Sequence, residues 1–94
     1  MRAVWDGVTV AEGDEVRECA GWRYFPRDAV RMELLRAVPH SERDLQCPHG
    51  VRFFDVVDGE RVATRAAWTY ESPRETHEAV RDWIGFWHEV ELTP

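Results

Sequence analysis

The sequence predicts a mainly β fold, and three features of the chain support that class. Turn-forming Gly, Pro and Asp residues recur at short intervals, which is typical of short strands joined by tight turns. The segments between these turns are rich in Val, Phe, Trp and Tyr, the residues that strands favour. Helical periodicity is convincing in only one place, after Pro73. A length of 94 residues suits one domain, so we expect residues 1–94 to fold as a single unit.

The first half of the chain indicates two pairs of strands. Ala3–Trp5 and Val8–Ala11 flank Asp6-Gly7, a dipeptide that supplies the positive φ angles a type I′ hairpin turn requires. Residues 16–19 and 22–25 form the next two candidates, with Gly21 between them. We therefore expect short antiparallel pairings at the start of the domain.

The second half continues the pattern with longer strands. Residues 51–57 are strongly apolar, and Asp58-Gly59 provides a hairpin turn toward a partner at 61–63. Residues 66–70 alternate well enough for another strand that places two aromatic side chains on one face. Residues 86–92 are expected to close the domain as a last strand.

Helical structure is expected in few places. Residues 26–30 can form a single helical turn, because proline pre-sets φ at its start. Residues 31–38 fit either a helical face or a strand. The best helix follows Pro73, where Ser72 is a plausible N-cap and Glu75 completes a capping box.

The composition restricts partners and location. Eighteen acidic against twelve basic residues give a net charge of -6, which repels phosphate backbones and argues against nucleic acid as a partner. All basic residues are Arg, which removes a Lys nucleophile or phosphate-loop Lys from consideration. No apolar run is long enough for a membrane span, and the N-terminal residues lack a signal-peptide pattern. We expect a cytoplasmic protein with no membrane partner, whose Cys19 and Cys47 are free thiols.

Cys47 and His49 lie one residue apart in the stretch LQCPHGV and raise the question of a reactive or metal-binding site. A structural zinc site needs four ligands at close quarters, and no second Cys or His pair accompanies this one. A catalytic thiol needs a base within hydrogen-bond reach and a lowered pKa. The dipeptide Pro48-His49 followed by Gly50 favours a turn. We therefore expect no metal and no cofactor, and we assign no catalytic residue.

The order of several segments resembles one family across almost the whole chain. These segments are MRAVWDGVTVAE, YFPRDAVRMELL, the Cys47-Pro48 pair followed by Gly50, DGE, AAWTYESP and IGFW. Together they resemble the bacterial domain of unknown function 427, which is sometimes labelled nucleotidyltransferase-like. The resemblance implies a β-tent: two small antiparallel sheets pinned at one edge, splayed at the other, with a cleft between them and a short helix in the C-terminal half. The family usually places an aromatic residue and a Lys before the glycine, where this chain has only His49.

The aromatic content suggests what such a cleft could do. Five Trp, four Phe and two Tyr are a heavy aromatic load, and Trp5, Tyr24, Trp68, Tyr70 and Trp87 exceed what a core of this size must contain. We predict an aromatic-lined cleft between the two sheets that binds a flat or cationic small molecule, or a peptide, by stacking and cation–π contact. The predicted ligand-binding residues are Trp5, Tyr24, Cys47, Arg52, Trp68 and Tyr70.

Other classes of function stay open. Nucleotidyl transfer requires carboxylates that converge in a cleft together with a basic group for phosphate, and the sequence contains no glycine-rich phosphate loop. A Cys-dependent enzyme is a further alternative. A third is a structural or oligomerisation domain, in which the aromatic face would be buried in a symmetric dimer. We expect a monomer or a small homo-oligomer.

Overall fold

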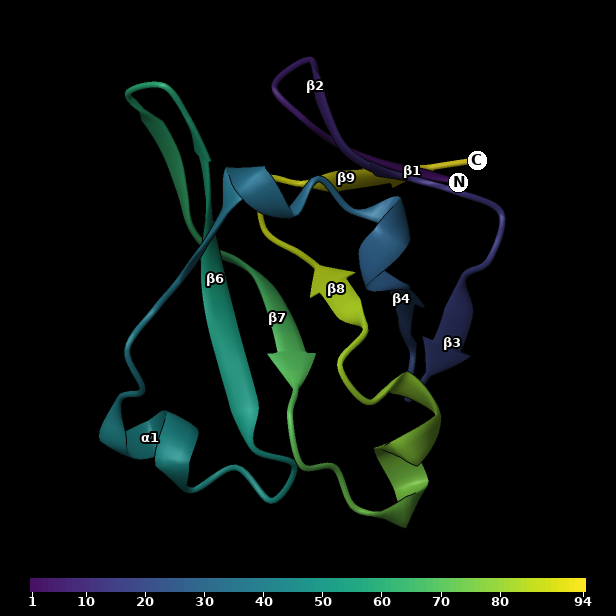
Figure 1. The fold of residues 1–94 in the computed structure, drawn as a ribbon, viewed down its shortest axis with the longest axis vertical. Coiled ribbons are helices and arrows are strands. Elements are labelled where there is room, and N and C mark those ends of the chain that lie inside the picture. Colours follow the sequence, from purple (N-terminus) through teal and green to yellow (C-terminus); the bar gives the residue numbers. More distant parts are fainter.

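A computed structural model describes residues 1–94 and shows two antiparallel sheets joined by short helical turns (Figure 1). The three-stranded sheet has the order β2-β1-β9, formed by Val8–Glu12, Arg2–Trp5 and Glu91–Thr93. The six-stranded sheet has the order β3-β4-β8-β7-β6-β5, formed by Arg17–Cys19, Trp22–Phe25, Ile84–Phe86, Arg61–Tyr70, Val51–Asp58 and Leu35–Ala37. The predicted mainly β class with two antiparallel sheets is confirmed.

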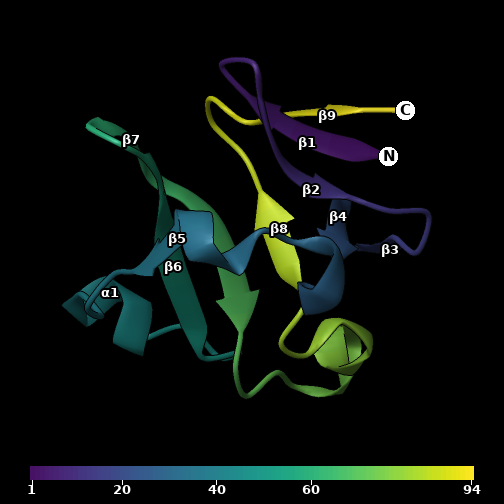
Figure 2. The same cartoon turned by 45° about the horizontal axis from the view of Figure 1, so that its top comes forward.

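Four short helices connect the strands. They are η1 (Arg27–Ala29), η2 (Met32–Leu34), α1 (Glu42–Leu45) and η3 (Glu75–Val80), of which only α1 is an α-helix. None of them has the length and apolar character that a membrane-spanning helix needs. Figure 2 shows the three-stranded sheet lying across one end of the six-stranded sheet, with both chain termini at the same end of β1 and β9.

The predicted turns between the first strands are present. Asp6 and Gly7 have φ angles of 46° and 82°, as the type I′ turn between β1 and β2 requires. Ala20 and Gly21 have φ angles of 51° and 88° and join β3 to β4 in the same way. The first four strand predictions therefore agree with the structure to within a residue or two at each end.

The β6–β7 hairpin differs from the prediction in two details. Asp58 pairs with Arg61, so the turn falls one residue later than predicted, at Gly59-Glu60. The two predicted strands at 61–63 and 66–70 are one continuous strand, β7, with an irregularity in the middle. Arg65 takes a φ angle of 51° there, and its backbone N–H donates to the Asp55 carboxylate at 2.9 Å. The carboxylate replaces the missing backbone partner, so the strand continues through the break.

The helix predictions were partly wrong. The segment after Pro73 forms the 3₁₀ helix η3, which starts after Arg74 without a side-chain cap. Ser72 does not cap it, because the Ser72 backbone N–H donates to the His49 carbonyl at 3.1 Å and holds this residue against the turn before β6. The single α-helix, α1, was not predicted. It begins at a capping box in which Ser41 and Asp44 exchange hydrogen bonds.

The predicted last strand at 86–92 is in fact two strands in different sheets. The chain turns at residues 87–90, where His88 has a φ angle of 56° and the Val90 N–H donates to the Trp87 carbonyl at 3.1 Å. β8 before the turn pairs in the six-stranded sheet, and β9 after it pairs with β1. At this turn the chain returns to the three-stranded sheet, which it left between β2 and β3.

The main core lies between the two sheets. It contains 14 buried residues, and the three-stranded sheet contributes Ala3, Trp5, Val10 and Ala11 to it. The six-stranded sheet contributes the residues on the face that points toward the three-stranded sheet. The members from that face are Phe25, Phe54, Val56, Ala63, Ala66, Ala67, Ile84 and Phe86.

Gly85 stands at the centre of the opposite face of the six-stranded sheet. It pairs with Tyr24 on one side and Trp68 on the other. A Cβ atom added to Gly85 would lie 2.7 Å from Cζ2 and 2.8 Å from Cε2 of the Trp68 indole. The indole therefore occupies the space that any side chain at this position would need.

We predict that Gly85→Ala lowers the free energy of unfolding by about 2–3 kcal/mol, because the new methyl group displaces a buried indole. The measurement is urea unfolding followed by far-UV circular dichroism. Gly13→Ala is the matched control, since its new Cβ meets a single methyl group at 3.2 Å, that of Ala29. Equal losses in the two variants would contradict the prediction.

Candidate functional site

Aromatic side chains gather on the face of the six-stranded sheet that points away from the main core. The buried members of this aromatic cluster are Tyr24, Val51, Trp68 and Val80. No member comes from the three-stranded sheet, whose buried residues all belong to the main core. The partly buried side chains packed against the cluster are Cys19, Cys47, Phe53, Tyr70, Trp83 and Trp87. The sheet thus has one face covered by a second sheet and one covered mostly by its own aromatic side chains.

A small hollow opens within this cluster. Its volume is about 100 Å³, and its six lining residues, here called the cage, are Trp22, Val51, Phe53, Trp68, Tyr70 and Trp87. Strand alternation explains the set, since Phe53 lies opposite Trp68 and Val51 lies opposite Tyr70 on the same face of β6 and β7. Trp22 is 44% exposed and leaves the hollow accessible.

The three tryptophan rings of the cage meet one another at steep angles. The ring centroids of Trp22 and Trp68 lie 5.3 Å apart with an interplanar angle of 88°. Trp22 and Trp87 lie 6.0 Å apart at 81°, and Trp68 and Trp87 lie 5.4 Å apart at 62°. Phe53 and Trp87 are the nearly parallel pair, 5.9 Å apart at 19°. Apart from Phe53 and Trp87, these rings in the lining of the hollow are therefore not parallel to one another.

A larger groove adjoins the cage and shares Trp22 and Trp87 with it. It has a volume of about 480 Å³ and touches both sheets, since Leu92 comes from β9. Its polar side chains include Glu18 and Arg23, which form an exposed ion pair at 3.7 Å, and His88. The full lining is Glu18, Gly21, Trp22, Arg23, Phe86, Trp87, His88, Val90 and Leu92.

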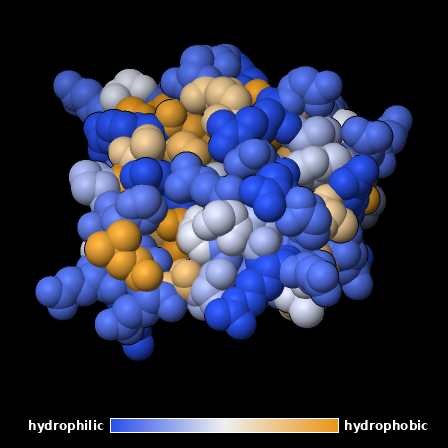
Figure 3. Space-filling model, turned by 60° about the horizontal axis from the view of Figure 1, so that its bottom comes forward, coloured by the Kyte–Doolittle hydropathy of each residue, from blue (hydrophilic) through white to orange (hydrophobic).

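Polar side chains cover much of the molecular surface. On the face that Figure 3 shows, hydrophilic side chains dominate and apolar groups form small separate patches. The large hydrophobic residues exposed on the whole surface are Trp22, Leu45 and Val62, and Trp22 is the aromatic one among them.

The predicted ligand-binding residues fall into two groups. Trp68 and Tyr70 line the cage, Tyr24 is buried beside them with its ring 5.7 Å from that of Trp68, and Cys47 packs against the cluster. Two predicted residues lie elsewhere, Trp5 and Arg52. The structure thus brings four of the six together.

Trp5 and Arg52 each have other contacts. Trp5 is part of the main core, with the guanidinium carbon of Arg61 5.2 Å from its ring centroid. Arg52 donates from Nη1 to the Val38 carbonyl at 3.1 Å, and its Nε lies 3.7 Å from Glu71. Arg52 follows Val51 in the strand, so alternation turns its side chain away from the cage.

The predicted ligand-binding residues omit Trp22 and Phe53, and also Val51 and Trp87, although Trp87 is one of the surplus aromatic residues. The first two carried a usable signal, because Trp22 stands two residues before Tyr24 and Phe53 stands two residues after Val51, which is the spacing of one strand face. Trp87 carried no such signal. Its position depends on the turn that follows β8, where its Nε1 donates to the Arg65 carbonyl at 2.6 Å.

Two buried polar atoms of the cluster lack hydrogen-bond partners, the Tyr24 hydroxyl and the Trp68 Nε1. Tyr24 is only 1% exposed, and burial, followed by the nearby Tyr70, raises the pKa of its hydroxyl far above the ordinary value of 10.0. Burial also raises the pKa of Tyr70. Both hydroxyls are therefore neutral at physiological pH and are not bases for a thiol.

No group of three or more His, Cys, Asp or Glu side chains is arranged to hold a metal ion.

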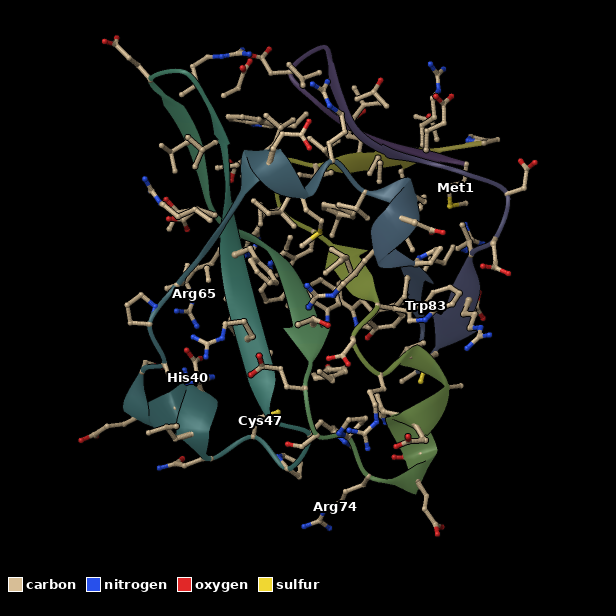
Figure 4. The ribbon with its side chains drawn as sticks, viewed as in Figure 1. Met1, His40, Cys47, Arg65, Arg74 and Trp83 are labelled. Atoms are coloured by element: carbon tan, nitrogen blue, oxygen red, sulfur yellow. The ribbon has the colours of Figure 1, made fainter.

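Arg65 lies against the cage from the side of α1. Its guanidinium carbon is 4.1 Å from the Phe53 ring centroid, and its Nη2 donates to Asp44 at 2.6 Å. Burial alone would raise the pKa of Asp44, but the Ser41 N–H and the Arg65 guanidinium outweigh it and lower the pKa below its ordinary value. Asp44 is thus a carboxylate that links the α1 cap to the aromatic cluster. Figure 4 shows Arg65 and His40 on the α1 side of the sheet.

The stretch LQCPHGV forms the turn that leads from α1 into β6. Gly50 has a φ angle of 66°, and its N–H donates to the Cys47 carbonyl at 3.3 Å. His49 faces the loop after β7, since its Nδ1 accepts from the Arg74 N–H at 3.1 Å and its ring centroid lies 4.0 Å from that of His77. Figure 4 shows Cys47 at the end of β6, with Arg74 beyond it at the edge of the molecule. The turn thus fastens the loop that carries η3.

The contact of His49 with this loop predicts a dependence of stability on pH. Burial, His77 and Arg74 lower the pKa of His49 below its ordinary value of 6.5. The folded state then binds the proton more weakly than the unfolded state, so the free energy of unfolding falls as the pH drops below about 6.5. We expect His49→Phe to show a smaller decline between pH 7.5 and 5.5 in urea unfolding. His88→Gln, which changes an exposed histidine outside this contact, is the control, and an unchanged decline in His49→Phe would contradict the assignment.

Comparison with known proteins identifies the family of this chain. A search of curated proteins finds no match. A family model described as a domain of unknown function, DUF427, matches residues 1–93. The match spans both sheets, the turn at Cys47, and every residue of the cage and the groove. The chain therefore belongs to the family of domain of unknown function 427.

Proposed function

We propose that the protein is a binding module that holds a compact small molecule or a peptide side chain in the cage. The observation that carries the proposal is the accessible hollow on the outer face of the six-stranded sheet, lined by five aromatic rings and one Val. Trp22 is exposed and the other rings of the cage are half-buried or buried, so a ligand group in the hollow would cover apolar surface that water now reaches at Trp22. A ligand group that covers it would gain roughly 25 cal/mol for each Å² of apolar surface removed from water.

The size of the hollows limits the ligand. A volume of about 100 Å³ is well below the roughly 300–1,000 Å³ of ordinary ligand pockets, so the cage admits one compact group. The adjoining groove of about 480 Å³ can hold the remainder of a larger molecule. Trp22 and Trp87 separate the two spaces and would contact both parts.

The experiment uses the five tryptophan indole N–H signals as separate reporters in ¹H–¹⁵N NMR spectra. A panel of compact apolar, aromatic and cationic compounds is titrated into the ¹⁵N-labelled protein. We expect a cage ligand to shift the signals of Trp22, Trp68 and Trp87 and to leave that of Trp5 unchanged, because Trp5 lies in the main core. Equal shifts at all five tryptophans, or none at millimolar concentration, would count against the proposal.

A variant tests the same site from the protein side. Trp22→Ala removes one wall of the cage at a half-exposed position, so we expect binding about tenfold weaker or worse with little loss of stability. Leu45→Ala is the matched control, because Leu45 is 70% exposed and lies outside the cage. Binding that Trp22→Ala leaves intact would place the ligand elsewhere.

The competing function, nucleotide-dependent transfer, is tested by adding the four ribonucleoside triphosphates with Mg²⁺ to the panel. Transfer requires a bound nucleotide, so it predicts a thermal shift and a released product. The absence of any shift with all four nucleotides would remove this alternative.

A further inference from the structure

We propose that the cage selects a methylated ammonium group, such as a trimethylammonium head. This inference rests on the proposed binding function and names the chemistry of the ligand. It follows from the angles between the rings, from the scarcity of hydrogen-bond acceptors in the lining, and from electrostatic surroundings that are compatible with a cation.

The geometry of the rings favours a rounded group over a flat one. A flat aromatic ligand held between two parallel rings needs them about 7 Å apart, twice the contact distance of about 3.5 Å between carbon atoms. The one nearly parallel pair, Phe53 and Trp87, has its centroids 5.9 Å apart and leaves no such gap. The rings of Trp22, Trp68 and Trp87 stand at 62° to 88° to one another, so the lining of the hollow is angular and offers no flat slot.

The lining offers few hydrogen-bond acceptors. The indole N–H groups of the cage can only donate: the Trp87 Nε1 is already bonded to the Arg65 carbonyl, and the Trp68 Nε1 is buried without a partner. Tyr70 supplies the single hydroxyl. A primary ammonium carries three N–H donors that would lose their water partners there, which is costly. A fully methylated ammonium has no N–H group and needs only the negative faces of aromatic rings.

The electrostatic surroundings are compatible with a cation. The Arg65 guanidinium carbon lies 4.1 Å from the Phe53 ring centroid, so a cation already contacts a cage ring. Its charge is balanced by Asp44 at 2.6 Å, which leaves no unpaired positive group against that ring. The net charge of the chain, -6, favours the approach of a cationic ligand over an anionic one.

The groove gives room for the rest of the molecule. A stem leaving the cage past Trp22 and Trp87 enters a space of about 480 Å³ with Glu18, Arg23 and His88 among its lining. A methylated ammonium group on a flexible stem has two sources, a small molecule such as choline or a trimethylated lysine side chain. The chemistry that the cage recognises is the same in both.

The test compares choline with its uncharged counterpart 3,3-dimethylbutan-1-ol, in which carbon replaces the nitrogen and the shape is kept. Isothermal titration calorimetry and the indole N–H signals measure affinity and site. We expect choline to bind at least about tenfold more tightly than the neutral compound. We also expect a trimethyl-lysine peptide to bind more tightly than the same peptide with unmodified lysine. The tighter of choline and the trimethylated peptide identifies the source.

A second variant distinguishes binding by the aromatic face of Trp22 from binding by apolar contact alone. Trp22→Leu keeps an apolar wall and removes the aromatic face, so we expect it to weaken choline binding about tenfold and to leave the neutral compound unchanged. Leu45→Ala, checked with Trp22→Leu for folding by circular dichroism, should bind both compounds as the natural protein does.

The outcomes distinguish this inference from the proposed function. Equal affinity for choline and the neutral compound, with the cage tryptophans shifted, would overturn the selection of a cation and leave the binding function standing. Tighter binding of a flat aromatic compound, with shifts at the same tryptophans, would also overturn the selection of a cation and leave the binding function standing. No shift of the cage tryptophans by any compound would overturn both.

Discussion

The contact between the Trp68 indole and the backbone of Gly85 is the constraint on which the outer face of the large sheet depends. Because β8 has no side chain at this point, the indole can lie directly against the sheet. Tyr24 and Trp22 then pack edge to face against that indole from β4, and Trp87 does so from the turn after β8. The cage is the space that these rings leave, so its shape follows from a missing side chain on the neighbouring strand.

The six-stranded sheet uses its two faces differently. One face is sealed by the three-stranded sheet, and the other carries aromatic side chains closed at one end by η3. The turn at residues 47–50 holds this end together, because it bonds to the loop at 71–74 through backbone groups and His49. A groove touching both sheets does exist, but the aromatic cage lies beside it on the outer face. Trp22 and Trp87 form the wall between them.

Local signals predicted well wherever a short segment determines its own shape. The Asp6-Gly7 turn and the strands around it depend on φ preferences and alternation within a few residues, and they were predicted correctly. Predictions failed where groups far away in the sequence determine where a strand or helix begins or ends. β7 continues through its break because Asp55 of another strand supplies a partner. Ser72 is not the N-cap that was predicted, because its backbone N–H is hydrogen-bonded to the carbonyl of His49 in the turn before β6. The turn at 87–90 ends β8 where apolar alternation would have continued the strand.

The sequence by itself determined the class of fold and the aromatic surplus, because turn residues, strand-forming residues and composition are local properties. It also placed Trp68 and Tyr70 on one face of a strand, since alternation needs no tertiary information. Only the tertiary structure decided which aromatic residues share a hollow. Trp5 lies between the sheets and Trp87 lines the cage, although both fall in segments that the sequence predicts as strands. The difference arises from strand order and from the two crossings between the sheets, which bring together residues far apart in the chain and which no local pattern encodes.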